Sequence, residues 1–308
     1  MSDTWLVVVN WNNAEDTLGL LSSLQAADLQ GTAVLLVDNG SSDGSVERVE
    51  ALHPWVTTLQ TGRNLGFAGG SNRGITFALD KGASVVGVLN NDTTVEPDFW
   101  PPLVSLALSG PVAVSPDIRY QTDPAKSWFY GGTARPYEGF PRHLQEPEQP
   151  SRGAPQESEL VTGCCFVASR ETWKAVGLFD ERYFLIFEDS DWSMRARSRG
   201  TRLMLEPSSR IYHGVSRSFR GSALATSRYY YSRNGLLFAR RWLGTRGAVA
   251  FAVKTGREAL TDLRHAGPQG LRYATLRLMG LGAVTARAYG PAGGLVTLLA
   301  GRDAVTRR

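Results

Sequence analysis

Residues 1–118 alternate between short β-branched runs and helix-like stretches, and this rhythm constrains the fold more than any other feature of the chain. The runs typical of strands are Trp5–Asn10, Ala33–Asp38, Val56–Gln60 and Ser84–Asn90. The stretches typical of helices are Glu15–Ala27, Ser45–Leu52 and Gly69–Lys81. Strands that alternate with helices predict an α/β fold with a mostly parallel central sheet flanked by helices. In such sheets ligands bind beyond the carboxyl ends of the strands, so the polar residues there are the first candidates for a site.

Three of the predicted strands end in residues with oxygen-bearing side chains. Asn10 ends the first strand. Asp38 ends the second, where it can accept hydrogen bonds from a nucleobase or a ribose, although the turn sequence that follows it would also explain an aspartate. Asp92, preceded by Asn90 and Asn91, suits a hard divalent cation that completes its coordination with diphosphate oxygens.

A glycine-rich segment, Arg63–Gly74, lies between a predicted strand and a predicted helix. Glycines allow the backbone to approach a ligand closely, and a helix N-terminus offers free N–H groups. The spacing is neither the GxGxxG dinucleotide fingerprint nor a P-loop. The glycines alone therefore identify no cofactor.

Three carboxylates, Glu188, Asp189 and Asp191, follow an aromatic stretch. A carboxyl group beside apolar bulk can have a raised pKa, which a general base near neutrality requires. The same residues also fit the N-terminus of a helix that Gly200 would end. The two interpretations are compatible.

Histidine supplies few candidates. His213 follows a short β-like run, and its local sequence favours a structural role over a ligand role. His53, His143 and His265 have no supporting context and are set aside.

The rest of the chain predicts a loop and a helical region. Arg135–Ser158 contains five prolines among charged residues, which indicates a long, mobile loop. After residue 222 the pattern becomes helical, and the expected helices are Ala223–Leu243, Gly247–His265 and Leu271–Ala288. The apolar run Gly280–Leu299 is interrupted by Arg287 and by glycines, so it fits a packed or interfacial helix better than a membrane span.

Charge is distributed unevenly along the chain. Residues 1–160 carry 9 Lys and Arg against 19 Asp and Glu, whereas the chain from Arg210 onward carries 17 against 3. A basic tail favours an anionic partner such as a membrane surface, a lipid phosphate or a nucleic acid, and a solvated basic face is the alternative. The acid- and Asn-rich strand ends fit a long polyanion poorly, which argues against nucleic acid.

The sequence also indicates a compartment. Cys164 and Cys165 are adjacent, an arrangement that rarely forms a disulfide, and we expect a reducing environment. The N-terminus lacks the pattern of a signal peptide, and no run of 18 uncharged apolar residues exists. We therefore expect a cytoplasmic protein without a spanning helix.

In chain order these segments resemble the family 2 glycosyltransferases of the GT-A fold, especially the bacterial rhamnosyltransferase-like branch. The resemblance covers about residues 4–243 and rests on Val9–Asn12, Val37–Ser41, Asn64–Asn72, Leu89–Asp92, Gly163–Phe166, Val176–Glu181, Glu188–Asp191, His213 and Tyr231–Asn234. The spacing between Gly177–Glu181 and Glu188–Asp189 is its most distinctive part.

This resemblance implies a role for each candidate residue. Asp189 would be the catalytic base. The residues that would orient the acceptor or a loop are Glu188, Asp191, Arg233 and Asn234, with the last two near a diphosphate or acceptor phosphate. The nucleotide-sugar-binding residues would be Asn10, Asp38, Arg63, Asn64, Gly66, Asn72 and Asn91. Asp92 and His213 would hold a divalent cation, Mg²⁺ or Mn²⁺, although Asn90 stands where the family's Asp-x-Asp motif has its first aspartate.

The implied reaction is an inverting single displacement in cell-envelope polysaccharide synthesis. The first expectation for the donor is dTDP-L-rhamnose, and the acceptor would be a saccharide or a polyprenyl-linked saccharide. The alternatives are a UDP-hexose donor with a soluble acceptor, or a non-catalytic sugar-nucleotide-binding protein.

The implied organisation has two parts. A catalytic domain would span residues 1–222, with a nucleotide-sugar half over 1–118 and an acceptor half over 119–222. A basic helical region would span 223–308 and contact the inner face of the plasma membrane peripherally.

Overall fold

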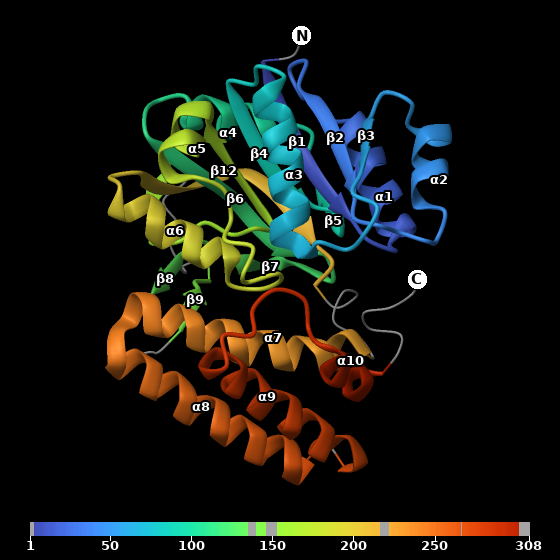
Figure 1. Cartoon of the computed structure of the whole chain (residues 1–308). Coiled ribbons are helices and arrows are strands. Elements are labelled where there is room, and N and C mark those ends of the chain that lie inside the picture. The colour runs from blue at the N-terminus through green and yellow to red at the C-terminus, as the bar shows by residue number, and fades with distance from the viewer. Residues whose placement is uncertain (1–2, 135–139, 146–152, 216–221, 266, 302–308) are drawn as a thin grey trace. The chain divides into compact units, whose positions relative to one another are not determined.

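The computed structural model describes residues 3–134, 140–145, 153–215, 222–265 and 267–301 (Figure 1). It divides into two compact units. The first contains the described residues of Met1–Thr133, His143–Phe179 and Asp189–Val215. The second contains those of Ala134–Arg142, Asp180–Glu188 and Ser216–Arg308. Two short segments that the sequence assigned to the catalytic domain, the described residues of 134–142 and the segment 180–188, cluster with the helical unit.

The first unit is built on a ten-stranded sheet in which eight strands follow the order β10-β12-β6-β11-β4-β1-β2-β3. Those strands are β1 (Thr4–Asn10), β2 (Ala33–Asp38), β3 (Thr57–Gln60), β4 (Val85–Asn90), β6 (Val112–Tyr120), β10 (Gln156–Glu157), β11 (Cys165–Ser169) and β12 (Arg202–His213). Two more strands join at the side: β5 (Thr93–Val95) pairs with β12, and β7 (Asp123–Phe129) pairs with β6. A separate two-stranded sheet contains β8 (Gly132–Ala134) and β9 (Pro141–His143).

The predicted α/β fold is confirmed, and its parallel part is the N-terminal half. Strand β1 pairs in parallel with β2 and β4, and β2 pairs in parallel with β3. Beyond β4 the sheet is mixed, because β11 runs antiparallel to both of its neighbours, β4 and β6. The carboxyl ends of β1, β2 and β4 therefore meet at one edge, with Asn10 opposite Asp38.

Helices cover both faces of this sheet, and alternate residues of each strand supply the two cores. Leu6 and Val8 of β1 pack with α1 (Ala14–Gln25), α2 (Ser45–Leu52) and α4 (Trp100–Ala107). Trp5 and Val7 face the opposite side, where α3 (Gly66–Asp80), α5 (Arg170–Val176) and α6 (Glu188–Ser198) lie. Helix α3 lies so close that a Cβ on Gly74 would come within 2.3 Å of a Val7 methyl group.

The second unit is mainly helical. Its helices are α7 (Ser222–Phe238), the π-helical segment η1 (Ala239–Leu243), α8 (Gly244–His265), the 3₁₀ turn η2 (Gly267–Gln269), α9 (Gly270–Thr285) and α10 (Gly294–Ala300). Phe184, Ala225, Tyr230 and Leu276 are among the residues of its core. No helix among the described residues is both long and apolar enough to cross a bilayer.

The predicted mobile loop, 135–158, is only partly described. Strands β9 and β10 lie within it, so the described part contains regular structure that its proline content did not predict. Residues 135–139 and 146–152 of the predicted loop lie outside the described residues.

Candidate active site

The carboxyl ends of β1 and β2 form a buried polar network. Asn10 is fully buried and donates from Nδ2 to Asp38 Oδ1 at 3.2 Å. The second oxygen of Asp38 accepts from the Ser41 backbone N–H at 3.0 Å. Asn91 Nδ2 donates to Asn10 Oδ1 at 3.2 Å and to the Thr17 hydroxyl at 2.9 Å. The structure thus brings three predicted residues together and adds Thr17 and Ser41, which the sequence did not single out.

The glycine-rich segment is held to the end of β2 by Asn39. Its Nδ2 donates to the Gly66 carbonyl at 2.9 Å, and its Oδ1 accepts from the Leu65 N–H at 3.0 Å. Gly40 adopts φ +79°, and a Cβ there would lie 2.6 Å from the Arg63 backbone. The backbone around Arg63 and Asn64 therefore lies beside Asp38, while the Arg63 side chain is exposed.

Asn72, expected in the nucleotide-sugar set, has a different environment. It is 6% exposed, and its Nδ2 and Oδ1 make reciprocal hydrogen bonds with the Phe179 backbone at 3.0 and 2.9 Å. These bonds connect residues 107 positions apart. Asn72 therefore fixes the chain ahead of α6, and this geometry does not point it at a nucleotide.

Asp92 and His213 lie side by side, although 121 positions separate them in the sequence. The antiparallel pairing of β5 with β12 sets His213 opposite Thr93, the residue after Asp92. His213 Nε2 lies 3.1 Å from Asp92 Oδ1, and both side chains are buried. His213 Nδ1 is buried and has no hydrogen-bond partner among the described residues.

The pair fits a divalent cation. Two ligands about 2.1 Å from a cation and at right angles to each other lie about 3 Å apart, close to the observed spacing. The described residues contain no group of three or more His, Cys, Asp or Glu that would enclose a metal. A cation here would consequently need further oxygens from a diphosphate and water.

His143, which has no supporting sequence context, lies beside His213 in the structure. The Trp128 ring contacts both imidazoles, with ring centroids 4.5 Å from His143 and 4.6 Å from His213. Although its side chain keeps an exposed edge, the pKa of His143 is lowered, first by loss of hydration and also by His213, while the Asp189 carboxylate opposes the change. No local pattern distinguishes this histidine, because its neighbours come from other strands.

Asp189 stands in the first turn of α6, the positive end of the helix dipole. Its Oδ2 accepts from the Gly163 N–H at 2.8 Å, and its Oδ1 accepts from the Ser190 N–H at 2.6 Å. The side chain is partly exposed. Burial, then Asp92 and more weakly Asp189, raises the pKa of the intervening Cys164 thiol. The Cys164 carbonyl accepts from the Asn90 N–H at 2.8 Å, so backbone contacts bring the residue next to Gly163 to the end of β4, where Asp92 follows.

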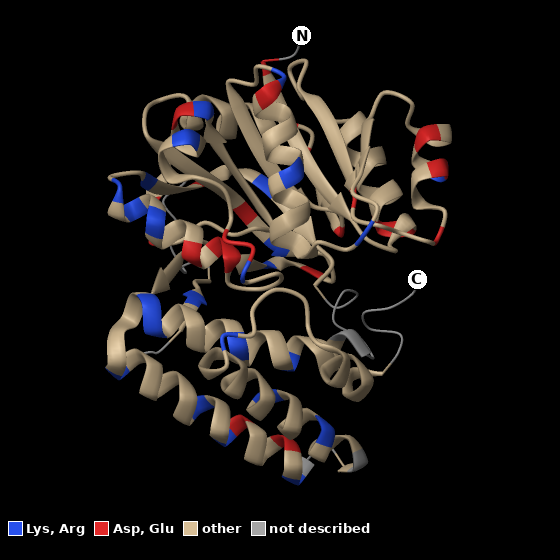
Figure 2. Cartoon of the chain, viewed as in Figure 1, with Lys and Arg blue, Asp and Glu red and all other residues tan. Residues whose placement is uncertain are grey.

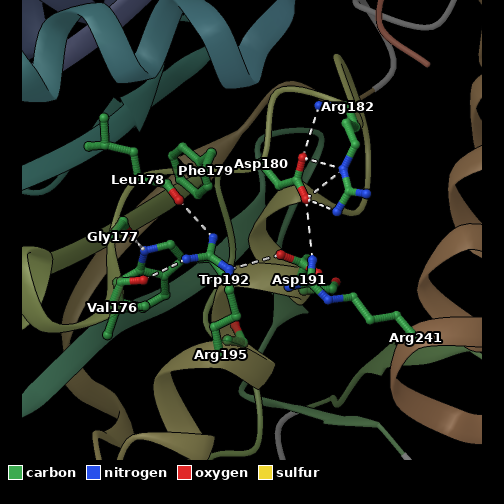
Figure 3. Close-up of polar contacts among 12 residues, drawn as sticks. Val176, Gly177, Leu178, Phe179, Asp180, Arg182, Asp191, Trp192, Arg195 and Arg241 are labelled. Atoms are coloured by element: carbon green, nitrogen blue, oxygen red, sulfur yellow. Dashed lines mark hydrogen bonds and ion pairs between the residues drawn. The ribbon is translucent and has the colours of Figure 1, made fainter.

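Asp191, two residues later, points the other way and is fully buried. It pairs with Arg195, whose Nε lies 3.0 Å from Asp191 Oδ2 (Figure 3). Arg195 also donates to the carbonyls of Val176 and Leu178, each at 2.7 Å. Asp191 thereby fixes the turn at Gly177 through Arg195.

Within the helical unit, Arg233 and Asn234 hold the segment 180–188. Asn234 Nδ2 donates to the carbonyls of Tyr183, Leu185 and Ile186 at 2.6–2.9 Å. Arg233 Nη2 donates to the carbonyls of Arg182 and Tyr183 at 3.0 and 2.9 Å. Both side chains are fully buried, so their geometry fits the loop-orienting part of the expectation and leaves them no surface for a phosphate.

These bonds constrain a strained stretch of backbone. Phe184, Ile186 and Phe187 have φ of +62°, +70° and +77°, a backbone region that residues other than glycine rarely adopt. Such strain persists only where the surroundings enforce it, and it concentrates at functional sites. Glu188, also predicted to orient the acceptor or a loop, is buried at the first position of α6 immediately afterwards.

Comparison with known proteins identifies the family. Residues 5–174 match the family described as glycosyl transferase family 2. The chain belongs to this family and is a glycosyltransferase.

Its relatives include two rhamnosyltransferases. It is 30% identical over 237 residues to the N-acetylglucosaminyl-diphospho-decaprenol L-rhamnosyltransferase of Mycobacterium tuberculosis, covering 69% of this chain and 76% of the relative. It is 24% identical over 254 residues to the dTDP-rhamnosyl transferase RfbF of Shigella flexneri, covering 78% and 81%.

Solved structures support the GT-A fold. The mannosyltransferase PcManGT of Pyrobaculum calidifontis, in complex with GDP-Man and Mn²⁺, superposes with a TM-score of 0.54 at 17% identity and covers 92% of this chain and 86% of its own. GalNAc-T7 with UDP, GalNAc and Mn²⁺ superposes with a TM-score of 0.57 at 15% identity over 82% of this chain. The matched part spans 54% of the GalNAc-T7 chain.

Proposed function

We propose that this protein transfers L-rhamnose from dTDP-L-rhamnose, with inversion, to a saccharide carried on a polyprenyl diphosphate. The observation that carries the reaction is a set of contacts within one unit: Asp189 accepts from the Gly163 N–H, and the neighbouring Cys164 carbonyl accepts from the Asn90 N–H, two residues before the Asp92 that contacts His213. The donor and the carrier rest on the two rhamnosyltransferase relatives, one of which acts on a decaprenol diphosphate by its name.

Asp189 is the general base in this proposal. It takes the proton from the acceptor hydroxyl while that oxygen attacks the anomeric carbon, and the bond to the nucleoside diphosphate breaks. The hydrogen bonds from Gly163 and Ser190 fix the carboxylate in one orientation. No covalent enzyme intermediate is needed, so one base suffices.

Asp92 and His213 hold a divalent cation in this proposal. When bound, the cation supplies positive charge to the departing diphosphate. Trp128 packs against the His213 ring and limits its rotation, which keeps the imidazole facing Asp92.

Asn10 and Asp38 recognise the nucleoside. Asp38 is 3% exposed, and Asn10 and Ser41 hydrogen-bond one carboxylate oxygen each, so its remaining lone pairs can accept from a base N–H or a ribose hydroxyl. Asn91 and Thr17 restrain Asn10 from the other side.

Helix α8 gives the protein a surface for the membrane that carries such an acceptor. Val249, Val253, Leu260 and Leu263 are 47–58% exposed, and their spacing puts them along one face of the helix. Figure 2 shows Lys and Arg distributed along α7, α8 and α9 with few Asp and Glu. An apolar stripe with basic neighbours fits the interface of an anionic bilayer, so we infer peripheral attachment at the cytoplasmic face of the plasma membrane.

A donor panel tests the proposal. Purified protein is given dTDP-L-rhamnose, UDP-glucose, UDP-N-acetylglucosamine or GDP-mannose with a short-chain isoprenyl-diphosphate saccharide, and products are identified by mass spectrometry. We expect transfer from dTDP-L-rhamnose alone, dependent on Mg²⁺ or Mn²⁺ and abolished by EDTA. Transfer from a UDP-hexose only would overturn the donor assignment. Failure to bind or consume any donor would indicate a non-catalytic protein.

A further inference from the structure

The helical unit contains an arginine-lined cavity that the reaction above does not use. Its volume is about 630 Å³, within the range of small-molecule sites. Four arginines line it, and we call it the arginine cavity: Arg182, Arg240, Arg241 and Arg287. All four belong to the second unit, so the cavity is complete within that unit.

The charge of the arginine cavity is poorly compensated. Arg182 Nη2 and Arg241 Nη1 both contact Asp180 Oδ2, at 2.5 and 3.2 Å (Figure 3). Partial burial raises the pKa of Asp180, but the hydrogen bonds and charge of Arg182, with help from Arg241, outweigh it and lower the pKa overall. Asp180 is therefore ionised and neutralises one guanidinium. Arg240 and Arg287 form no ion pair among the described residues, which leaves a net excess of positive charge for an anionic ligand.

Irregular backbone presents these arginines. Arg240 and Arg241 lie in the π-helical segment η1, a form that occurs mostly as single-turn insertions in α-helices and frequently at functional sites. Arg287 follows the end of α9 and adopts φ +53°, which is unfavourable for an arginine. Two such departures beside one cavity indicate that the arginines are directed into it at some cost in stability.

The cavity also has apolar walls. Leu237 from α7 and Val284 from α9 line it together with Tyr289. A ligand that satisfies both kinds of wall carries a doubly charged anionic group and a hydrocarbon part. Guanidinium groups bind phosphate oxygens in pairs, so a diphosphate matches several arginines at once.

We propose that the arginine cavity binds the diphosphate of the isoprenoid-linked acceptor, with the first part of the hydrocarbon chain against Leu237 and Val284. This inference rests on the proposed function, because it assigns part of the same acceptor. Chain connectivity favours this source of diphosphate over a free anion or a phospholipid. The segment that carries Arg182 continues directly into Asp189. Arg182, which would bind the diphosphate, is therefore seven residues from the proposed base in the sequence.

The test measures binding of farnesyl diphosphate by titration calorimetry, without donor. The variant combines Arg240→Gln with Arg287→Asn, since asparagine tolerates the positive φ at position 287. Both side chains are exposed and lie outside every described ion pair, so the fold should persist, which a thermal melt checks. Each lost charge-assisted contact costs about tenfold in affinity, so we expect at least tenfold weaker binding. Arg240→Gln alone should give a smaller loss in the same direction.

The matched control combines Arg73→Gln with Lys174→Gln, which removes the same charge from exposed positions in the first unit. It should bind farnesyl diphosphate as the wild type does.

Undiminished binding by the cavity variant would overturn the inference. Equally tight, cavity-dependent binding of inorganic diphosphate would replace it with a free-anion site. If the substitutions weakened only binding to phosphatidylglycerol vesicles, the ligand would be a phospholipid. In each of these cases donor turnover by the wild type would leave the proposed function standing, whereas absence of donor binding would remove it independently.

Discussion

Three carboxylates within four residues have three different environments. Asp189 is partly exposed and bonded to backbone N–H groups, Asp191 is fully buried against Arg195, and Glu188 is buried at the start of α6. Only Asp189 combines an oriented carboxylate with access for a substrate. The division of labour within the cluster therefore follows from the helix that begins there, since successive residues of a helix point in different directions.

Asp191→Asn should destabilise the protein rather than change its chemistry. The substitution leaves the Arg195 charge unpaired, and Arg195 is 12% exposed at its side chain. Removing one partner of a buried ion pair typically costs about 3–5 kcal/mol. We expect a clear fall in Tm by calorimetry. Asp123→Asn, which breaks an exposed pair with Lys126, is the control and should leave Tm nearly unchanged. Equal effects of the two substitutions would contradict the positioning role of Asp191.

Asp92→Asn and His213→Ala should separate metal-dependent from metal-independent donor binding. In the proposed function each of the two side chains, 3.1 Å apart, would give the cation one ligand atom. We expect both variants to bind dTDP with the same affinity in EDTA as the wild type does, and to lose the increase in affinity that Mn²⁺ gives the wild type. Titration calorimetry with and without Mn²⁺ measures this difference. A retained Mn²⁺ effect in both variants would show that the cation is held elsewhere.

At the scale of elements, the strained segment ahead of α6 depends on one amide. Asn234→Ala removes three hydrogen bonds to the carbonyls of Tyr183, Leu185 and Ile186. Each buried group left without a partner costs about 1–3 kcal/mol. We therefore expect faster hydrogen exchange over residues 183–188, measured by mass spectrometry, together with reduced transfer activity. Ser227→Ala is the control on the same helix, because that hydroxyl bonds only within α7. Unchanged exchange at 183–188 would mean that other contacts suffice.

Local sequence was sufficient for most elements of the first 118 residues. The β-branched runs and helix-like stretches predicted β2 and α2 with the bounds that the structure has, and predicted β1, β4 and α3 to within three residues. The polar ends of β1 and β2 were predictable because parallel strands bring their carboxyl ends together. Such inferences need only the chain's local periodicity and one rule of topology.

Long-range pairing was not predictable in the same way. His213 meets Asp92 because β12 pairs with β5, and no local pattern encodes that register. His143 joins them through Trp128, and Asn72 bonds Phe179 across 107 positions. The resemblance to a family suggested a metal-binding role for His213, whereas neither a motif nor a spacing pointed to the place of His143 beside it.

At the scale of the whole molecule, the uneven charge coincides with the division into units. The acidic first half contains the residues proposed to bind the nucleotide, and the basic end of the chain supplies most of the helical unit. The described residues of 134–142 and the segment 180–188 cluster with the helical unit although they lie within the catalytic part of the sequence. Packing, which local sequence does not encode, decides which unit these segments join.

Vesicle binding should depend on the apolar stripe of α8. Leu260→Gln with Leu263→Gln removes two exposed apolar side chains without changing charge. Burial of each such side chain contributes about 1.5–3 kcal/mol, so we expect at least tenfold weaker binding to phosphatidylglycerol vesicles in a flotation assay. Transfer to a water-soluble acceptor should be unchanged. Unaltered flotation would argue against attachment through α8.

The most direct test of the central claim compares wild-type protein with Asp189→Asn in transfer from dTDP-L-rhamnose to an isoprenyl-diphosphate saccharide. NMR would assign the anomeric configuration of the product, and calorimetry would measure donor binding. We expect an inverted rhamnoside from the wild type, and a turnover number lower by at least roughly 10²-fold in the variant with donor affinity retained. Near wild-type turnover by Asp189→Asn, or a product with retained configuration, would contradict the mechanism.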